Sequence, residues 1–400
     1  LVAIPQSLAY AELAGLPAQH GLFASALPSI AAAAFVSSRH LQTGPVALTS
    51  LLTFGALSGL APTGTLEFAR LAAVLALLVG LFRLILGLVR LGRLAYLLSE
   101  PVLTGFTTAA AVLILSSQLP KVFDADSGDG GVLVEAVRAL VEVDNWRPAA
   151  VGFSVATAAV IVIGRRLHRL FPGVLVAVVA ATAAVALFGY GGSTTGELEG
   201  GFVGFSLDLP WDSATGLVVP AFVIALVGFA EPSSIARTFA ARDRVPWDAN
   251  REMVSQGVAN LVAGLTRAFP VGGSFSRSSL NRLAGATSPW AGAITGLCVL
   301  LALPVTPVLA DLPRAVLGTI VLVAVVGLLR FDQLLALIRS NRAQGLVGIG
   351  TFAATLVASP RVERGVLVGI VLALAVHLYR ELSVTAESDW NGSELVVRPK

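Results

Sequence analysis

One arginine stands inside a short run of serines and glycines in a very apolar chain. The run is VGGSFSRSSLNR, residues 271–282, and the arginine is Arg277. Of the 400 residues, 56% are hydrophobic and only 13% are charged, whereas soluble domains carry roughly 25% charged residues. A charge at the centre of a bilayer costs ~2.5–3.5 kcal/mol on insertion scales. We therefore interpret Arg277 as facing an anion; an arginine that extends to the membrane surface, or that pairs with Glu231, is the alternative.

Two apolar segments begin in a way that would help to bind an anion. They are HLQTGPVALTSLLTFGALSGL, residues 40–60, and PVGGSFSRSSLNRLAGA, residues 270–286. A helix that starts inside the membrane exposes unpaired N–H groups and about half a positive charge. Two such starts that point at each other make an anion site. The residues predicted at these starts are Gly44, Pro45, Val46 and Ala47, and Gly273, Ser274, Phe275 and Ser276.

A carboxylate is also predicted within an apolar segment. Glu231 follows a long apolar run in ALVGFAEPSSIAR, residues 225–237. An intramembrane carboxylate is a candidate functional group. It could bind a proton, coordinate Na⁺ or neutralise Arg277, and a structural ion pair near the cytoplasmic face is the alternative. A weaker candidate is Glu12, which is predicted near the outer end of the first segment, where water can solvate it.

The elements that must position these residues are membrane spans of about 20 mostly apolar residues. We predict fourteen: 1–15, 21–37, 44–60, 67–89, 94–119, 147–164, 170–190, 214–236, 250–267, 274–286, 288–306, 313–329, 343–359 and 363–382. Two amphipathic stretches, 130–143 and 331–341, are predicted to lie on the membrane surface. With the start of the first span cytoplasmic, sixteen basic residues, Arg83 among them, fall on the inside and eight on the outside. This bias favours a cytoplasmic C-terminus.

The two unusual segments occupy matching places among these spans. They are third and tenth of fourteen, so two sets of seven superpose them, and an odd repeat forces the second set to be inverted. From residue 274 to 286 a helix would span about 20 Å at 1.5 Å per residue, short of a ~30 Å hydrocarbon core. Short segments interrupted by glycine or proline, at matching places in two halves, indicate a transporter binding site.

Several motifs together resemble one family. VAIPQSLAYAELAGLPAQHGLFASALPSI resembles the first two spans of the sulfate permease (SulP) family of anion transporters. SSRHLQTGPVALTSLL, SEPVLTGFTTAAAVLI and GGSFSRSSLN resemble its third, fifth and tenth segments, so the resemblance covers essentially the whole chain. It implies an all-α membrane fold of two inverted seven-segment repeats, with segments 3 and 10 as half-helices preceded by short strands.

The resemblance also implies domains and site residues. A core domain would hold residues 1–92 and 214–310 and a gate domain residues 93–213 and 311–382, in one transport domain that moves like an elevator. Residues 383–400 would begin a truncated cytoplasmic STAS domain, which in the full-length protein contributes to a homodimer. By motif, Gln6 and Tyr10 would face the substrate, Val46 would border it, and Ser274, Ser276 and Arg277 would contact the anion.

These observations predict a secondary active transporter of a bacterial inner membrane, surrounded by lipid. The substrate would be a small anion (sulfate, bicarbonate or a dicarboxylate), coupled to H⁺ by Glu231, with Na⁺ the second choice. An uncoupled exchanger or channel-like conductor, a nucleobase–proton symporter, and a regulatory or motor protein that binds anions are the alternatives. We expect no enzyme activity, metal or other cofactor, because the four histidines are scattered and no metal-ligand spacing occurs. Dispersed arginines also argue against nucleic-acid binding.

Overall fold

A computed structural model describes residues 2–92, 99–126, 128, 130–198, 201, 204–382, 386–390 and 395–399, and these are mostly helical. Within these ranges, six helices are long and apolar enough to cross a membrane: Leu66–Leu88, Glu100–Phe123, Pro148–Leu167, Trp211–Asp243, Trp290–Leu309 and Arg314–Ser340. Shorter helices occupy most of the other predicted spans. The predicted start of the fifth span at residue 94, and residues 383–385, 391–394 and 400, lie outside the described residues.

The elements follow one another along the chain with few long connections. They are α1 (Ala3–Leu13), α2 (Gln19–Ser25), α3 (Leu27–Phe35), β1 (Thr43–Gly44), α4 (Ala47–Leu57), α5 (Leu66–Leu88), α6 (Glu100–Phe123), α7 (Val132–Val141), η2 (Val143–Asn145), α8 (Pro148–Leu167), α9 (Gly173–Phe188), η3 (Trp211–Ser213), α10 (Ala214–Asp243), α11 (Ala249–Leu265), β2 (Gly272–Gly273), α12 (Phe275–Leu283), α13 (Trp290–Ala302), η4 (Leu303–Leu309), α14 (Arg314–Val325), η5 (Val326–Leu328), α15 (Phe331–Ser340), α16 (Arg342–Ala358), α17 (Glu363–Leu382), β3 (Ala386–Trp390) and β4 (Leu395–Pro399).

Two details of the predicted spans differ from the structure. The span predicted over 21–37 is divided into α2 and α3 at Ala26, because Pro28 in the first turn of α3 has no N–H to continue the preceding helix. Arg83, counted above with the cytoplasmic flanks, is instead fully buried in α5. The two amphipathic stretches form helices, α7 and α15, as their sequence pattern indicates.

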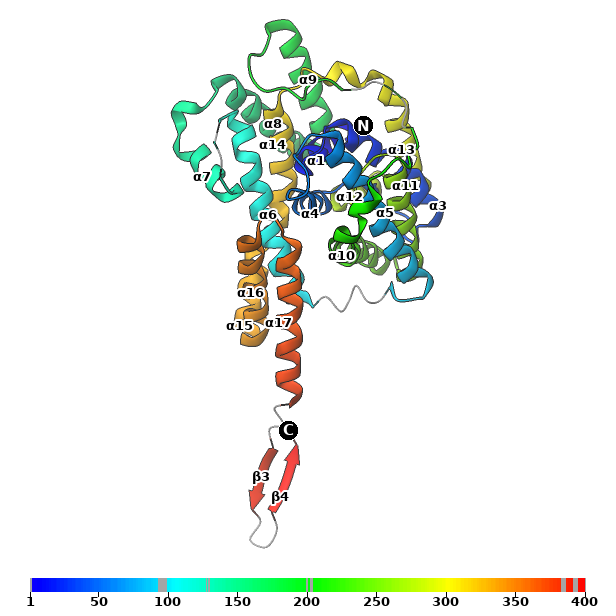
Figure 1. Ribbon diagram of the computed structural model, residues 1–400, viewed down its shortest axis with the longest axis vertical. Helices are drawn as coiled ribbons and strands as arrows, with labels where there is room; N and C mark the ends of the chain where they lie inside the picture. Colours follow the sequence, from blue (N-terminus) through cyan, green and yellow to red (C-terminus); the bar gives the residue numbers. More distant parts are fainter. Residues whose placement is uncertain are drawn as a thin grey trace.

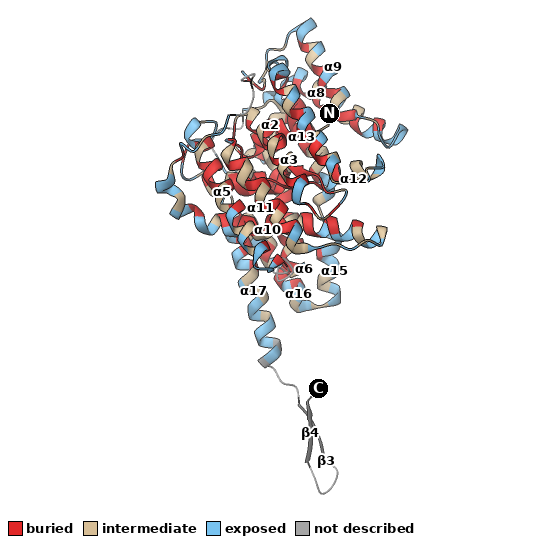
Figure 2. Cartoon of the chain, turned by 90° about the vertical axis from the view of Figure 1, so that its right-hand side faces the viewer, coloured by how far each residue is buried: buried red, intermediate tan, exposed pale blue. Residues whose placement is uncertain are grey.

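The helices form two groups, which lie side by side in Figure 1. The first helix group, α1–α5 with α10–α13, packs mainly through α5, α11, α3 and α10. The second helix group, α6–α9 with α14–α17, packs mainly through α6, α14 and α16. Buried residues concentrate where helices of the first group meet, whereas α17 presents mostly exposed residues (Figure 2). Contacts of α1 with α14 and of α4 with α6 join the two groups.

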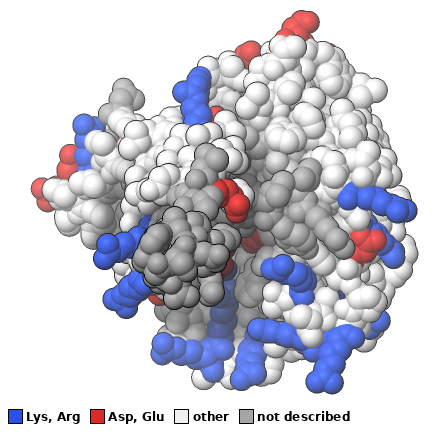
Figure 3. Space-filling model, turned by 90° about the horizontal axis from the view of Figure 1, so that it is seen from below, with Lys and Arg blue, Asp and Glu red and all other residues white. Residues whose placement is uncertain are grey.

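Charges are distributed unevenly over the surface. Figure 3, a view from below, shows arginine-rich clusters around this face and few acidic side chains. Exposed arginines occur in the segments predicted to be cytoplasmic, at the end of α10 and around α15: Arg237, Arg242, Arg244, Arg330, Arg339 and Arg342. This distribution agrees with the arginine bias in the sequence.

Close contact between α5 and α11 depends on glycine. A Cβ atom added to Gly257 of α11 would lie 2.7 Å from the backbone N of Leu84, and one added to Gly80 of α5 would lie 2.6 Å from the backbone N of Leu261. Small residues let helix backbones approach closely in membrane proteins, where association depends on packing. The α5–α11 pair is therefore a rigid base for the residues that both helices carry.

We expect Gly257→Leu to separate α5 from α11 and to lower the thermal unfolding midpoint by several degrees, because overpacking costs about 1–3 kcal/mol. The matched control is Gly152→Leu in α8, where an added Cβ meets no atom within 4 Å. Both midpoints can be measured on detergent-purified protein by size-exclusion chromatography after heating. Equal midpoints for the two variants would contradict this account of the packing.

Candidate functional site

Two very short strands bring the starts of α4 and α12 together. β1 and β2 pair antiparallel, with Thr43 opposite Gly273 and Gly44 opposite Gly272, and all four residues are buried. Because the strands are antiparallel, α4 and α12 leave this crossing in opposite directions, with their N-termini beside it. Ser274, the N-cap of α12, accepts a hydrogen bond from the backbone N–H of Arg277 at 3.4 Å.

A polar row on α11 holds both strands in place. Glu252, Gln256 and Asn260 are spaced four residues apart, so they lie on one face of the helix, and none is exposed. Asn260 accepts from the backbone N–H of Val271 at 2.9 Å and donates to its carbonyl at 3.0 Å. Gln256 donates to the Thr43 hydroxyl at 2.8 Å. Asn260 thus fixes the residue before β2, and Gln256 fixes the first residue of β1.

Further hydrogen bonds attach the chain before β1 to its surroundings. Glu252 accepts from the backbone N–H groups of Ser37 and Ser38, at 3.3 and 3.0 Å, and from the Trp247 indole at 3.2 Å. On α12, the Ser278 hydroxyl accepts from the backbone N–H of Gln42 at 2.9 Å. These residues were not predicted from the sequence, although polar residues at every fourth position of the apolar span 250–267 are a signal for them.

Arg277 is the group at the crossing that points most clearly to a ligand. Its side chain is buried, with the residue only 5% exposed, and Nη2 donates to the carbonyl of Pro45 at 2.6 Å. Its Nε and Nη1 have no hydrogen-bond partner among the described residues. The guanidinium lies against Gly44, since a Cβ there would come within 2.9 Å of Nη1. Two buried donors without acceptors are costly, and an anion at the crossing would satisfy them.

Other predicted site residues gather around Arg277. Tyr10 and Glu231 both interact electrostatically with it. The Glu231 carboxylate faces the backbone N–H of Phe275 and also interacts with Arg330. Gln6 lies one helical turn before Tyr10 and is 2% exposed, and its Oε1 has no partner among the described residues.

The remaining predicted residues occupy different positions. Val46 and Ala47 are buried at the start of α4, whereas Phe275 is 56% exposed. Ser276 is exposed and its hydroxyl lies 3.3 Å from that of Ser274. Glu12 takes part in a contact between the helix groups, in which its carboxylate lies 3.1 Å from Lys121 Nζ and 3.7 Å from Arg314 Nε.

A cavity of about 640 Å³ leads to these groups. It runs between the two helix groups, with α10 on one side and α6 with η5 on the other. Glu231 and Phe275 line it together with the hydroxyls of Ser233, Thr104 and Thr107. Exposed Arg237 and Arg330 belong to the same lining, so the cavity reaches the arginine-rich end of the molecule. A small anion fits a space of this size.

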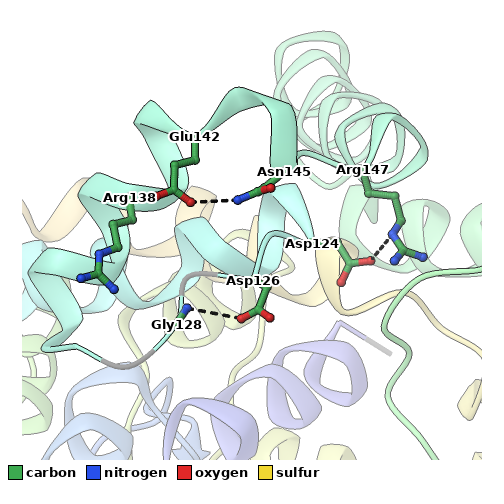
Figure 4. A pocket seen from close by; sticks show the side chains of 7 residues that line it. All are labelled: Asp124, Asp126, Gly128, Arg138, Glu142, Asn145 and Arg147. Carbon is green, nitrogen blue, oxygen red and sulfur yellow. Dashed lines mark hydrogen bonds and ion pairs between the residues drawn. The ribbon is translucent and has the colours of Figure 1, made fainter.

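A second, surface pocket of about 520 Å³ has a different character. It lies in the loops around α7. Figure 4 shows Asp124 paired with Arg147 at 3.1 Å, and the Glu142 carboxylate accepting a hydrogen bond from the Asn145 amide at 2.8 Å. Burial, reinforced by the neighbouring Asp124 carboxylate, raises the pKa of Tyr190 to about 12. Asp124 contacts Arg147 and the backbone N–H of Ser193, so the charged groups of this pocket hold neighbouring loops together. Among the described residues, no three His, Cys, Asp or Glu side chains are grouped to hold a metal ion.

Comparison with known proteins identifies the family. The model of the "Sulfate permease family" matches residues 1–351. The chain belongs to the sulfate permease family. It is 35% identical over 392 residues to "Sulfate transporter 4.1, chloroplastic" of Arabidopsis thaliana (95% of this chain, 57% of the relative). It is 33% identical over 419 residues to human "Solute carrier family 26 member 6" (95% and 54%). The family consists of transporters of sulfate and other anions, not of enzymes, and this chain spans a little over half the length of these two members.

Solved structures show the same fold. A structure of SLC26A9 superposes with a TM-score of 0.89 at 23% identity, covering 100% of this chain and 67% of the other. The transmembrane domain of a cyanobacterial bicarbonate transporter, BicA, superposes with a TM-score of 0.75 at 21% identity, covering 93% and 94%. This sulfate permease family member is therefore a multi-pass membrane protein with the transmembrane fold of these transporters.

Asn260 offers a test of how the crossing is held. We expect Asn260→Leu to impair anion uptake and lower the thermal midpoint, because it leaves the N–H of Val271 buried and unpaired, at about 1–3 kcal/mol, and removes one of the two donors to the Val271 carbonyl, the other being Arg83 Nη1. Ser255→Ala is the control on the same helix, since it removes only a hydroxyl that donates to the Ala32 carbonyl. Thermal unfolding and uptake should both be measured. An Asn260→Leu protein as active and stable as the control would show that β2 holds its position without this contact.

Proposed function

We propose that this chain is a secondary active transporter that binds a small anion at the crossing of β1 and β2. The observation that carries the proposal is Arg277, which lies beside two helix N-termini and whose buried Nε and Nη1 have no acceptor among the residues that the structure describes. Backbone N–H groups, helix dipoles and a guanidinium all favour an anion at one point. Sulfate, bicarbonate and dicarboxylates each offer several oxygen acceptors for these donors.

The other predicted residues have complementary roles in this proposal. Gln6 and Tyr10 donate from α1, and Ser274 and Ser276 donate from the start of α12. Val46 and Ala47, at the start of α4, supply backbone N–H groups and an apolar wall. Phe275 lines the approach from the cavity. The anion would be surrounded by donors from three helices.

The architecture that we propose for transport is an elevator. Fourteen segments in two inverted repeats would form a core domain, residues 1–92 and 214–310, that slides past a gate domain, residues 93–213 and 311–382. Half-helices in segments 3 and 10 would carry the site. The separation into two helix groups and the cavity between α6 and α10 support this division. Glu12, with Lys121 and Arg314, would be one of the contacts that change as the domains slide.

Glu231 is the group that we assign to coupling. It shares the electrostatic environment of Arg277, and Tyr10 and Arg330 are the other ionisable groups that act on it. A protonated Glu231 leaves the positive charge of Arg277 to the anion, whereas an ionised carboxylate competes with the anion for that charge. Proton-coupled symport follows, with Na⁺ the second candidate for the coupling ion. Glu12 is a weaker candidate, since it is already paired with Lys121.

We also propose the setting of the protein. The arginine-rich end would face the cytoplasm of a bacterium from its inner membrane, which places the C-terminus inside. Residues 383–400 would lead into a STAS domain, and the full-length protein would form a homodimer in lipid. A nucleobase–proton symporter is disfavoured, because a carboxylate on the tenth segment would be needed to accept from the base, and α12 offers serines and Arg277.

Arg277→Ala is expected to raise the KM for the transported anion about ten- to a hundred-fold, because hydrogen bonds to charged groups contribute about 1.5–3 kcal/mol. Uptake of labelled sulfate, bicarbonate and fumarate into proteoliposomes is the measurement. Arg277→Lys keeps the charge but loses the planar set of guanidinium donors, so its KM should lie between those of the wild type and Arg277→Ala. Arg339→Ala, at an exposed position of α15, is the control. An unchanged KM in Arg277→Ala would contradict the proposed site.

Glu231→Gln is expected to abolish the dependence of uptake on an inward proton gradient while exchange of anions across the membrane continues, because a neutral amide cannot carry the proton. Wild-type and variant proteoliposomes are compared with and without the gradient. A variant that still responds to the gradient would exclude Glu231 as the coupling group. A wild type that exchanges anions without any gradient effect would indicate an uncoupled exchanger, and anion currents would indicate a channel.

A further inference from the structure

Arg83 is a buried charged side chain that has no role in the transport mechanism proposed above. It lies within α5 and is 0% exposed. Its guanidinium donates three hydrogen bonds, from Nε to the Ala225 carbonyl at 3.1 Å, from Nη2 to the Ile224 carbonyl at 3.1 Å and from Nη1 to the Val271 carbonyl at 2.9 Å. All three acceptors are backbone groups, two in α10 and one immediately before β2.

The positive charge of Arg83 has no negative partner in the part of the chain that the structure describes. No carboxylate there forms an ion pair with it, and no acidic side chain acts on it electrostatically. Arginine cannot release its proton to escape the cost of burial, and an uncompensated buried charge is expensive. Hydrogen bonds to carbonyls alone do not require a cation, because a neutral amide can donate to two of them. The charge itself therefore requires an explanation.

The position of Arg83 supplies that explanation. Val271, which it holds, is followed directly by Gly272 of β2. A Cβ on Gly228 would touch both the Arg83 guanidinium and the methyl group of Thr49, in the first turn of α4. Gly272 in turn lies against Thr49 and Val46, because an added Cβ would come within 3.6 and 3.2 Å of their side chains. Arg83 is thus packed directly behind the two helix starts, on a rigid support.

We propose that Arg83 is a second fixed positive charge of the anion site, and that it makes the site prefer doubly charged anions. This inference rests on the proposed function, in which the anion occupies the crossing of β1 and β2. Arg83 does not touch the anion: it positions Val271 and acts through its field, which the apolar surroundings screen only weakly. Because the energy of that field is proportional to the charge of the anion, losing it weakens a dianion more than a monoanion.

The buried charges around the crossing are consistent with a dianion. The charges of Arg83 and Arg277 together balance one sulfate or dicarboxylate when Glu231 carries a proton. Glu252, the other buried carboxylate nearby, is already held by the N–H groups of Ser37 and Ser38 and the Trp247 indole. Bicarbonate, with a single charge, would leave one guanidinium unbalanced. Among the candidate substrates, the structure therefore favours sulfate and dicarboxylates.

The test compares anions of one shape and different charge. Sulfate and perchlorate are both tetrahedral oxyanions, with two charges and one. Their inhibition constants against labelled substrate should be measured in proteoliposomes for the wild type, Arg83→Gln and Arg83→Lys. The control is Arg70→Gln, which removes a partly exposed arginine, paired with Asp208, from the same helix. We expect Arg83→Gln to lower the sulfate-over-perchlorate preference about ten-fold, whereas Arg83→Lys and Arg70→Gln retain most of it.

The outcomes separate this inference from the proposed function. If Arg83→Gln weakens both anions by the same factor, Arg83 is only structural and the inference is wrong. If Arg83→Gln does not fold, the wild type and Arg83→Lys test the inference instead. It is wrong if the wild type binds sulfate and perchlorate with equal affinity, or if Arg83→Lys loses the preference for sulfate. Failure of the wild type to bind or move any anion would instead refute the proposed function.

Discussion

The structure depends on one constraint: backbone polar groups within a membrane must find partners inside the protein. The chain breaks its helical hydrogen bonding at residues 36–46 and 266–274, and each break frees N–H and C=O groups. β1 and β2 satisfy some of these groups by pairing with each other. Asn260 of α11 and Ser278 of α12 satisfy others. The polar faces of α11 and α12, unusual for helices in such an apolar chain, exist because these two breaks must be supported.

This support leaves a limited set of donors free at the crossing. Arg277 gives one hydrogen bond to Pro45, and its Nε and Nη1 have no acceptor in the described part of the chain. Gly44 lets the guanidinium approach the β1 backbone, since any larger residue would collide with it. The donors of Arg277 and of the two helix starts thus converge because the surrounding backbone is already satisfied. An anion could therefore bind to these donors without rearranging the backbone around them, because that backbone is already hydrogen-bonded.

Hydropathy and motif located the charges at the candidate site but not the side chains that hold its backbone. Arg277 and Glu231 could be found from the sequence because a charge in an apolar run is costly wherever it points. The polar row of α11 was missed, because its role depends on which neighbour a helix face meets, and hydropathy does not report that. Arg83 was misplaced for the same reason: it lies close enough to the end of its span to be read as a flank, yet it faces inward. The division of α2 from α3 at Ala26 reflects Pro28, whose effect on a short apolar run was not weighed.

A carrier of the kind proposed must release the anion that it binds, and the charges around the crossing of β1 and β2 suit that requirement. Two arginines that never lose their protons would hold a dianion tightly in both orientations of the site. The Arg83 guanidinium already donates to three backbone carbonyls, so in the proposed site it would contribute a field rather than a direct bond. In the proposed site Arg277 would supply the direct bonds, and Glu231, which interacts electrostatically with it, would be the group that takes up the proton. In the proposed mechanism, Arg83 and Arg277 would provide a constant field and Glu231 an adjustable one, so that protonation of this carboxylate would switch the site between holding and releasing its anion.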